Sequence, residues 1–210
     1  MQYLDEYLLD KDYSKDSVLV SGGSVMLLND LYEAPFTNFH ISSNHHNLIM
    51  LPDMVVALDK HTIPILEGYR GLKCGKYDEA NIHIGMCPSF GFSGAAAVWL
   101  ADYMGFGTVL IAGYSCYLDK GKSYWHHEPS QSKKPHVSTT EAQQRIIWDM
   151  VRCSMKNPDR VRVMSGFLQK IFKPWRKNDE YRKVCAERER RCRPSYCYHG
   201  GRCEPSERPS

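Results

Sequence analysis

Two short serine–glycine segments in this chain of 210 residues have the composition of phosphate-binding turns. Ser21-Gly22-Gly23-Ser24 follows a short apolar run, and Ser93-Gly94 precedes a run rich in alanine. Glycine permits a tight turn and a close approach of the backbone, and free N–H groups at the start of a helix bind phosphate oxygens. Neither segment has the spacing of a P-loop or of G-x-G-x-x-G, so a tight turn without a ligand stays open as the alternative.

Polar residues also follow two other apolar runs. Asn44 follows the run 39–43, and Asp59 follows the run 54–58. In open parallel sheets, ligands bind beyond the carboxyl ends of the strands, near the point where the strand order reverses. We therefore expect Asn44 and Asp59 to lie at the same sheet edge as the two serine–glycine segments, where a nucleotide would bind.

One histidine and two tyrosines have the chemistry that a transfer reaction from a phosphate needs. The reference pKa of imidazole, about 6.5, suits His136 to deprotonate an acceptor hydroxyl near neutral pH. The hydroxyls of Tyr117 and Tyr124 can donate hydrogen bonds to a leaving phosphate without a metal ion. From the residues alone, a surface histidine and ordinary loop tyrosines are the simpler interpretation.

The remaining histidines and thiols do not predict a metal site in the body of the chain. His45-His46 and His126-His127 are adjacent pairs, and neighbours on a strand point to opposite faces. Cys87 has no surrounding signature of a nucleophile, and we expect a buried thiol there.

These candidate residues must be positioned by a predicted alternation of strands and helices. The apolar runs lack polar alternation and are separated by helical segments, which favours a parallel sheet covered on both faces. We predict a doubly wound α/β fold. Strands are expected at 17–21, 39–43, 54–58, 80–85, 108–112 and 161–164, and helices at 24–31, 95–104 and 138–155.

The ends of two predicted helices carry specific signals. Gly105 is placed as the C-terminal glycine of the helix over 95–104. Ser138 and Glu141 have the S-x-x-E spacing of a capping box at the start of the last helix. The predicted apolar stripe of that helix consists of Ile146, Ile147, Met150 and Val151.

Charged residues divide the chain into two parts. Residues 173–210 contain 11 basic and 6 acidic residues, whereas residues 1–172 contain 16 basic and 18 acidic residues. The net charge of only +3 argues against a nucleic-acid-binding surface over the whole chain. No apolar run approaches the ~18 residues that a membrane span needs.

The basic tail leaves several interpretations open. Its cysteines fit a zinc site with His199, the first half of an epidermal-growth-factor-like module, or a flexible tail with incidental thiols, which is the simplest interpretation. Its arginines are compatible with an acidic or nucleic-acid partner, but the interleaved Glu187 and Glu189 favour a solvated helix face as the simpler interpretation. The four tail cysteines are Cys185, Cys192, Cys197 and Cys203.

The segment from Phe92 to Tyr114 resembles a signature shared by two related groups of Rossmann-like proteins. One group is the bacterial lipooligosaccharide sialyltransferases. The other is the MptE-like hydroxymethylpterin pyrophosphokinases, which have many phage and bacterial members. The resemblance covers roughly residues 17–151 and implies a Rossmann-like nucleotide-binding domain and a cytoplasmic location. From the division of charges and cysteines, we place this domain at residues 1–172 and a tail outside the site at 173–210.

The resemblance to the sialyltransferases also implies roles for individual residues. Ser21-Gly22-Gly23-Ser24 stands where these enzymes have a turn against the nucleotide sugar, and Ser93-Gly94 stands at a nucleotide contact. Asn44 stands where an asparagine closes the second strand, and Asp59 follows the third strand.

The same resemblance implies which residues take part in the transfer reaction. Tyr117 and Tyr124 resemble the tyrosine pair that binds the donor phosphate, and His136 resembles the general base. Phe90 stands where those enzymes have an arginine, so the sugar of the donor stays open.

The implied function is transfer of a sugar from a nucleotide-sugar donor without a metal ion or another cofactor. One alternative is an Mg²⁺-dependent, pyrophosphokinase-like phosphoryl transferase, for which Asp59 is the best metal ligand. Another is a catalytically idle domain for nucleotide binding or assembly, since a shared fold does not establish shared chemistry.

Overall fold

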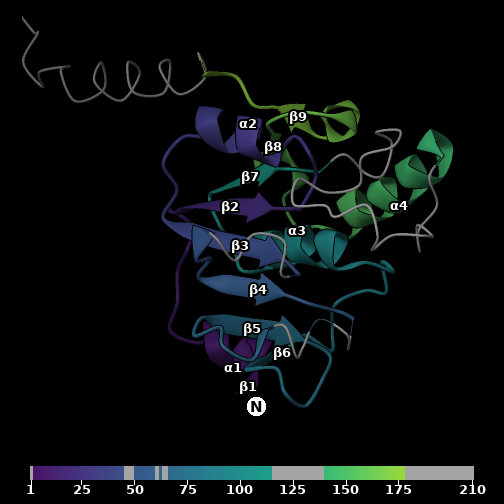
Figure 1. Ribbon diagram of the computed structural model, residues 1–210. Helices are drawn as coiled ribbons and strands as arrows, with labels where there is room; N and C mark the ends of the chain where they lie inside the picture. Colours follow the sequence, from purple (N-terminus) through teal and green to yellow (C-terminus); the bar gives the residue numbers. More distant parts are fainter. Residues whose placement is uncertain (1, 45–49, 60–61, 63–65, 115–139, 178–210) are drawn as a thin grey trace, which may run out of the picture. The chain divides into compact units, whose positions relative to one another are not determined.

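The computed structural model of the chain describes residues 2–44, 50–59, 62, 66–114 and 140–177. In this part of the chain, nine strands form one sheet in the order β1-β6-β5-β4-β3-β2-β7-β8-β9 (Figure 1). Every strand pairing is parallel. The predicted α/β class with a doubly wound, mainly parallel sheet is confirmed.

The bounds of the elements are as follows. The strands are β1 (Gln2–Tyr3), β2 (Ser17–Ser21), β3 (Phe39–Ser43), β4 (Met54–Val56), β5 (Leu72–Gly75), β6 (Ile82–His83), β7 (Thr108–Ala112), β8 (Val161–Val163) and β9 (Lys173–Pro174). The α-helices are α1 (Leu4–Leu8), α2 (Leu27–Glu33), α3 (Ser93–Tyr103) and α4 (Glu141–Ser154). Short 3₁₀ helices cover Pro158–Arg160 and Phe167–Lys170.

The strand order reverses next to β2. The chain runs from β2 outward through β3 and β4, and then returns through α3 to place β7 on the other side of β2. The boundary between β2 and β7 is therefore the switch point at which open α/β sheets bind their ligands. Strands β2, β3 and β7 have the predicted bounds, and β4, β6 and β8 lie inside the predicted ranges.

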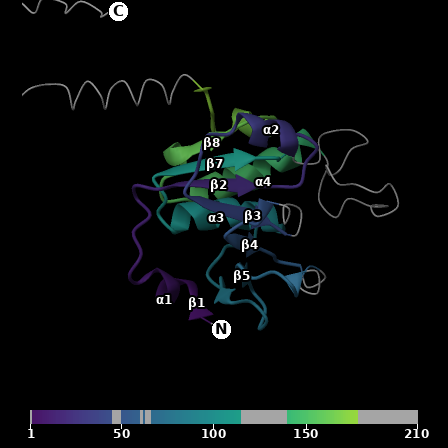
Figure 2. The same ribbon diagram turned by 60° about the vertical axis from the view of Figure 1, so that its left-hand side comes forward.

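The two faces of the sheet are covered by different helices (Figures 1 and 2). Val18 and Val20 of β2 pack in the main core with the buried residues of α3. Leu19 points to the opposite face, where it packs with Leu27 of α2. This division follows from the alternation of side chains along a strand, and it explains why the strand lacks a polar face.

Helix α3 is buried almost all round. Its residues Ser93–Asp102 are buried, and Gly105 beyond its end has a positive φ of 87°. That backbone conformation favours glycine, which confirms the predicted C-terminal signal.

Helix α4 begins with a different cap and buries a different stripe from those predicted. Thr140 is the N-cap, and its Oγ1 accepts a hydrogen bond from the backbone N–H of Gln143 at 3.4 Å; the predicted cap, Ser138, lies outside the described residues. Two residues predicted in the buried stripe are instead largely exposed: Ile146 is 61% exposed and Met150 is 56% exposed. The buried residues are Gln144, Trp148 and Val151.

The reason for the altered phase is the large indole of Trp148. It is fully buried and makes edge contacts with the rings of Phe92, Tyr114 and Phe172. Burying this ring rotates the helix so that Ile146 and Met150 face outward, because residues four apart share one side of a helix.

The compact unit that holds the sheet spans Met1–Trp175. It includes β9, which lies just beyond the predicted domain end at residue 172. None of the helices in the described part of the chain is both long and apolar enough to cross a bilayer.

Candidate functional site

The carboxyl edge of the sheet gathers most of the described candidate residues. Ser21 ends β2, Asn44 follows β3, Asp59 lies three residues beyond β4, and Ser93 begins α3. The Oγ of Ser93 accepts a hydrogen bond from the backbone N–H of Leu58 at 2.9 Å. This bond joins the start of α3 to the segment that carries Asp59.

A second bond ties β3 to β4 at the same edge. The backbone N–H of Asn44 donates to the carbonyl of Val56 at 2.8 Å, and Asn44 has a positive φ of 55°. Asparagine tolerates this left-handed conformation better than most residues. The predicted gathering of Asn44, Asp59 and Ser93 at one edge is therefore what the fold produces.

Two backbone hydrogen bonds join the turn after β2 to the end of β7 and the turn that follows it. The N–H of Gly22 donates to the carbonyl of Ala112 at 2.9 Å, and the N–H of Ser24 donates to the carbonyl of Gly113 at 3.0 Å. The predicted helix start at residue 24 is wrong, because α2 begins at Leu27. These two N–H groups are thus already used within the protein and are not free donors for a phosphate.

Close packing at the switch point explains why glycine occupies two of the predicted positions. A Cβ at Gly94 would lie 2.5 Å from Cε1 of the Tyr114 ring, and a Cβ at Gly22 would lie 3.1 Å from its Cε2. A Cβ at Gly22 would also lie 2.5 Å from the carbonyl oxygen of Gly113. Gly94 is therefore required mainly by the Tyr114 ring and Gly22 mainly by the Gly113 carbonyl, whether or not a ligand binds there.

Asp30 is a site-edge residue that the sequence analysis missed. It is 5% exposed, and its Oδ2 accepts the backbone N–H of Gly113 at 2.8 Å. Burial raises the pKa of this carboxyl group, while the bond from Gly113 opposes that rise. The sequence feature that could have indicated a buried role for Asp30 is its position three residues after Leu27, on the side of α2 that faces the sheet.

Ser21 lies inside the sheet rather than at its surface. The residue is fully buried, and its Oγ lies 2.7 Å from Nε2 of His40 on β3. Burial lowers the pKa of His40 to about 4, and the nearby charge of Asp53 opposes that change. The sequence feature that could have indicated this contact is a histidine within a strand that is buried on both faces.

Tyr77 is the second missed residue at the carboxyl edge. It follows β5 by two residues, and its ring lies against Gly75, where a Cβ would be 3.2 Å from Cδ2. Burial raises the pKa of Tyr77, and the charge of Asp59 adds to the rise. Tyr77 is therefore a neutral hydroxyl close enough to Asp59 to experience its charge.

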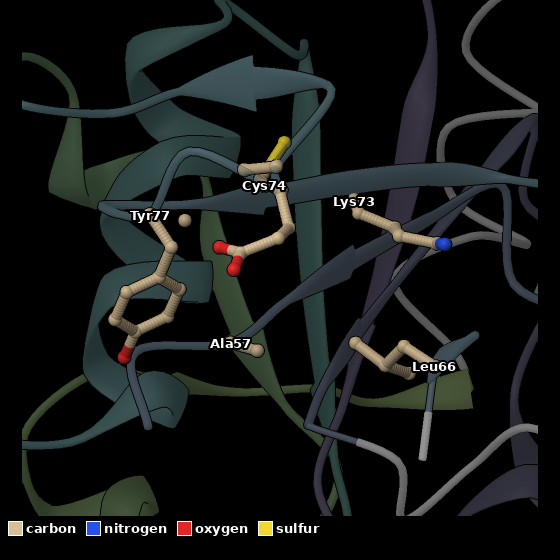
Figure 3. A pocket seen from close by; sticks show the side chains of 8 residues that line it. Ala57, Leu66, Lys73, Cys74 and Tyr77 are labelled. Atoms are coloured by element: carbon tan, nitrogen blue, oxygen red, sulfur yellow. The ribbon is translucent and has the colours of Figure 1, made fainter. Parts of the chain in front are cut away.

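A small hollow lies beside Tyr77 on the sheet (Figure 3). Its volume is about 20 Å³, which is room for about one water molecule and far too little for a nucleotide. The residues that line it are Ala57, Leu66, Lys73, Cys74, Gly75, Tyr77, Glu79 and Ala80.

The other candidates fall into two groups. His136, Tyr117, Tyr124, both histidine pairs and the four tail cysteines lie outside the described residues. Cys87 is buried as predicted, and burial raises the pKa of its thiol to about 11. In the part of the chain that is described, no three His, Cys, Asp or Glu side chains cluster as a metal site would require.

Comparison with protein-family models, curated proteins and solved structures finds no significant match to this chain. Among the structural observations, a ligand-binding role is therefore supported by the geometry of the carboxyl edge.

Proposed function

We propose that the chain binds a nucleotide-sugar at the carboxyl edge of its sheet and transfers the sugar without a metal ion. The observation that carries this proposal is the gathering of Asn44, Asp59 and Ser93 at adjoining element ends beside the β2–β7 switch point. Hydrogen bonds hold these ends together before any ligand arrives, which reduces the ordering cost of binding.

An acceptor at this edge suits a nucleotide. Ser93 is only 2% exposed, and its Oγ accepts from the backbone N–H of Leu58, so this residue holds the start of α3 against the segment that carries Asp59. Asp59 is exposed and carries an acceptor for sugar hydroxyls or for base amino groups. Asp59 thus offers an exposed acceptor on a segment whose position is fixed by the bond to Ser93.

For the transfer step, the proposal follows the resemblance of the chain to the sialyltransferases. His136 takes the proton of the acceptor hydroxyl, and Tyr117 and Tyr124 donate hydrogen bonds to the leaving phosphate. Replacing His136 by alanine should abolish turnover and leave nucleotide affinity unchanged. Unchanged turnover would remove His136 from the mechanism.

A thermal-shift screen tests the binding step. CMP, UDP, GDP, ADP and sugar derivatives of these nucleotides are added with and without Mg²⁺. A ligand at 100 times its Kd stabilises the folded state by about 2.7 kcal/mol, which raises the unfolding midpoint measurably. We expect a shift with at least one nucleotide in the absence of Mg²⁺.

Two other results would change the assignment. A shift that requires Mg²⁺ and is lost in Asp59→Asn would favour the phosphoryl transferase. No shift with any nucleotide would favour a catalytically idle domain. Asp78→Asn is the matched control, because Asp78 is an exposed carboxylate on the segment that follows β5.

A further inference from the structure

Among the buried polar atoms without a hydrogen-bond partner in the described part of the chain, two follow strands on either side of β4. They are Oδ1 of Asn44, after β3, and Oη of Tyr77, after β5. Buried polar groups in folded proteins nearly always have a partner, so each such atom calls for a water molecule or a ligand group.

Asp59 lies on the segment between them in strand order. It follows β4, its side chain is exposed, and its charge acts on the Tyr77 hydroxyl. The segments after three adjacent strands, β3, β4 and β5, thus carry a buried amide oxygen, an exposed carboxylate and a buried phenol hydroxyl.

A hollow borders this edge next to Tyr77, and neither Asn44 nor Asp59 lines it. Figure 3 shows Tyr77 and Ala57 on its border, with the Tyr77 hydroxyl directed away from Cys74. Its volume of about 20 Å³ accepts a group of the size of a water molecule or a hydroxyl.

The chemistry of the three groups is that of a vicinal diol site. Each hydroxyl of a diol both donates and accepts a hydrogen bond. Asp59 and Asn44 supply acceptors, and Tyr77, whose hydroxyl stays protonated at neutral pH, supplies a donor. Carboxylates after strands of such sheets commonly bind ribose hydroxyls.

We propose that Asn44, Asp59 and Tyr77 form a subsite for the 2′ and 3′ hydroxyls of the nucleotide's ribose. This assignment rests on the proposed function, because it requires that a nucleotide binds at this edge. It adds Tyr77 to the site and makes the site selective for ribonucleotides over 2′-deoxyribonucleotides.

Calorimetric titration with matched pairs of ligands tests the subsite. The probes are CMP, UMP, AMP and GMP, each beside its 2′-deoxy counterpart. For the nucleotide that binds, we expect the ribonucleotide to bind roughly tenfold more tightly than the deoxy form, as the loss of one or two hydrogen bonds implies.

Variants then assign that selectivity to residues. Tyr77→Phe and Asp59→Asn should each weaken ribonucleotide binding and leave deoxyribonucleotide binding nearly unchanged, which also shows that the variants are folded. Tyr7→Phe is the control for loss of a tyrosine hydroxyl, since Tyr7 on α1 bonds Tyr13 instead. Asp78→Asn is the control for loss of an exposed carboxylate, and both controls should keep the full selectivity.

The possible failures are distinguishable. Equal binding of the two nucleotide forms, or selectivity that survives in both Tyr77→Phe and Asp59→Asn, would overturn the subsite and leave the proposed function standing. Absence of binding by every nucleotide would overturn both.

Discussion

The carboxylate of Asp30 accepts the backbone N–H of Gly113 at 2.8 Å and so joins α2 to the turn that ends β7. Gly113 has a positive φ of 69°, and a Cβ there would lie 2.9 Å from the carbonyl oxygen of Gly22. One carboxylate therefore holds a turn that packs against the turn after β2. The two turns border the switch point, so their conformation determines the shape of the candidate site.

Replacing Asp30 separates the role of its hydrogen bond from the role of its charge. Asp30→Ala leaves the buried N–H of Gly113 without its acceptor and should lower the free energy of unfolding by about 1–3 kcal/mol. Asp30→Asn keeps an oxygen acceptor and should cost less than about 1 kcal/mol. Urea denaturation of both variants measures the difference, and equal losses would show that the bond does not stabilise the turn.

Gly94 is required by the ring of Tyr114. Gly94→Ala brings a Cβ to 2.5 Å from Cε1 of that ring and should destabilise the protein by about 1–3 kcal/mol, as overpacking does. Gly68→Ala is the control, because nothing lies within 4 Å of a Cβ there.

A double variant identifies the source of the strain at Gly94. Combining Gly94→Ala with Tyr114→Ala should remove most of the added cost of the alanine, since contacting residues are not additive. Thermal unfolding of the single and double variants provides the comparison. Fully additive effects would mean that the ring is not the obstacle.

His40 makes stability depend on pH. Its pKa is lowered from 6.5 to about 4 in the folded protein, so the unfolded chain binds more protons between these values. The stability that this group contributes is complete above pH 6.5 and is lost as the pH falls toward 4, by up to about 3 kcal/mol. His40→Gln should flatten the pH dependence of unfolding in this window, and an unchanged profile would show that His40 is not responsible.

The buried side of α4 is testable by truncation. Trp148→Ala removes a fully buried indole and should cost about 3–5 kcal/mol in the free energy of unfolding. Ile146→Ala and Met150→Ala should each change it by less than about 0.5 kcal/mol, because both side chains are mostly exposed. If truncating Ile146 or Met150 lowered the free energy of unfolding more than truncating Trp148, the buried stripe predicted from the sequence would be correct instead.

Six of the nine strands in the described part of the chain were predicted, because most of them lie in continuous apolar runs. Strand β5 (Leu72–Gly75) was missed because its four residues include Lys73 and Gly75 and form no such run, and β1 and β9 were missed as well. Ser17–Ser21 and Thr108–Ala112 read as strands covered on both faces, and both are. The short edge strands β1 and β9 carry no such run: each has two residues, and pairing with a neighbouring strand defines them. Local sequence cannot show such a pairing.

The site was predictable only in part for the same reason. Asn44 and Asp59 follow visible strands, so their common edge could be inferred. The bond between Ser21 and His40 and the effect of Asp59 on Tyr77 depend on which strands are neighbours. The stripe of α4 was misassigned because a count of apolar residues does not show that burying one tryptophan outweighs exposing Ile146 and Met150.

The central claim is that a nucleotide binds at the carboxyl edge of the sheet, and amide chemical-shift mapping tests it most directly. ¹H–¹⁵N spectra are recorded while the nucleotide that gives the largest thermal shift is added. The account predicts that the shifts concentrate on the amides of Asn44, Asp59, Ser93 and Gly94, with little change at Asp16 and Asp53 on the opposite edge. Shifts confined to other residues, or none with any nucleotide, would contradict it.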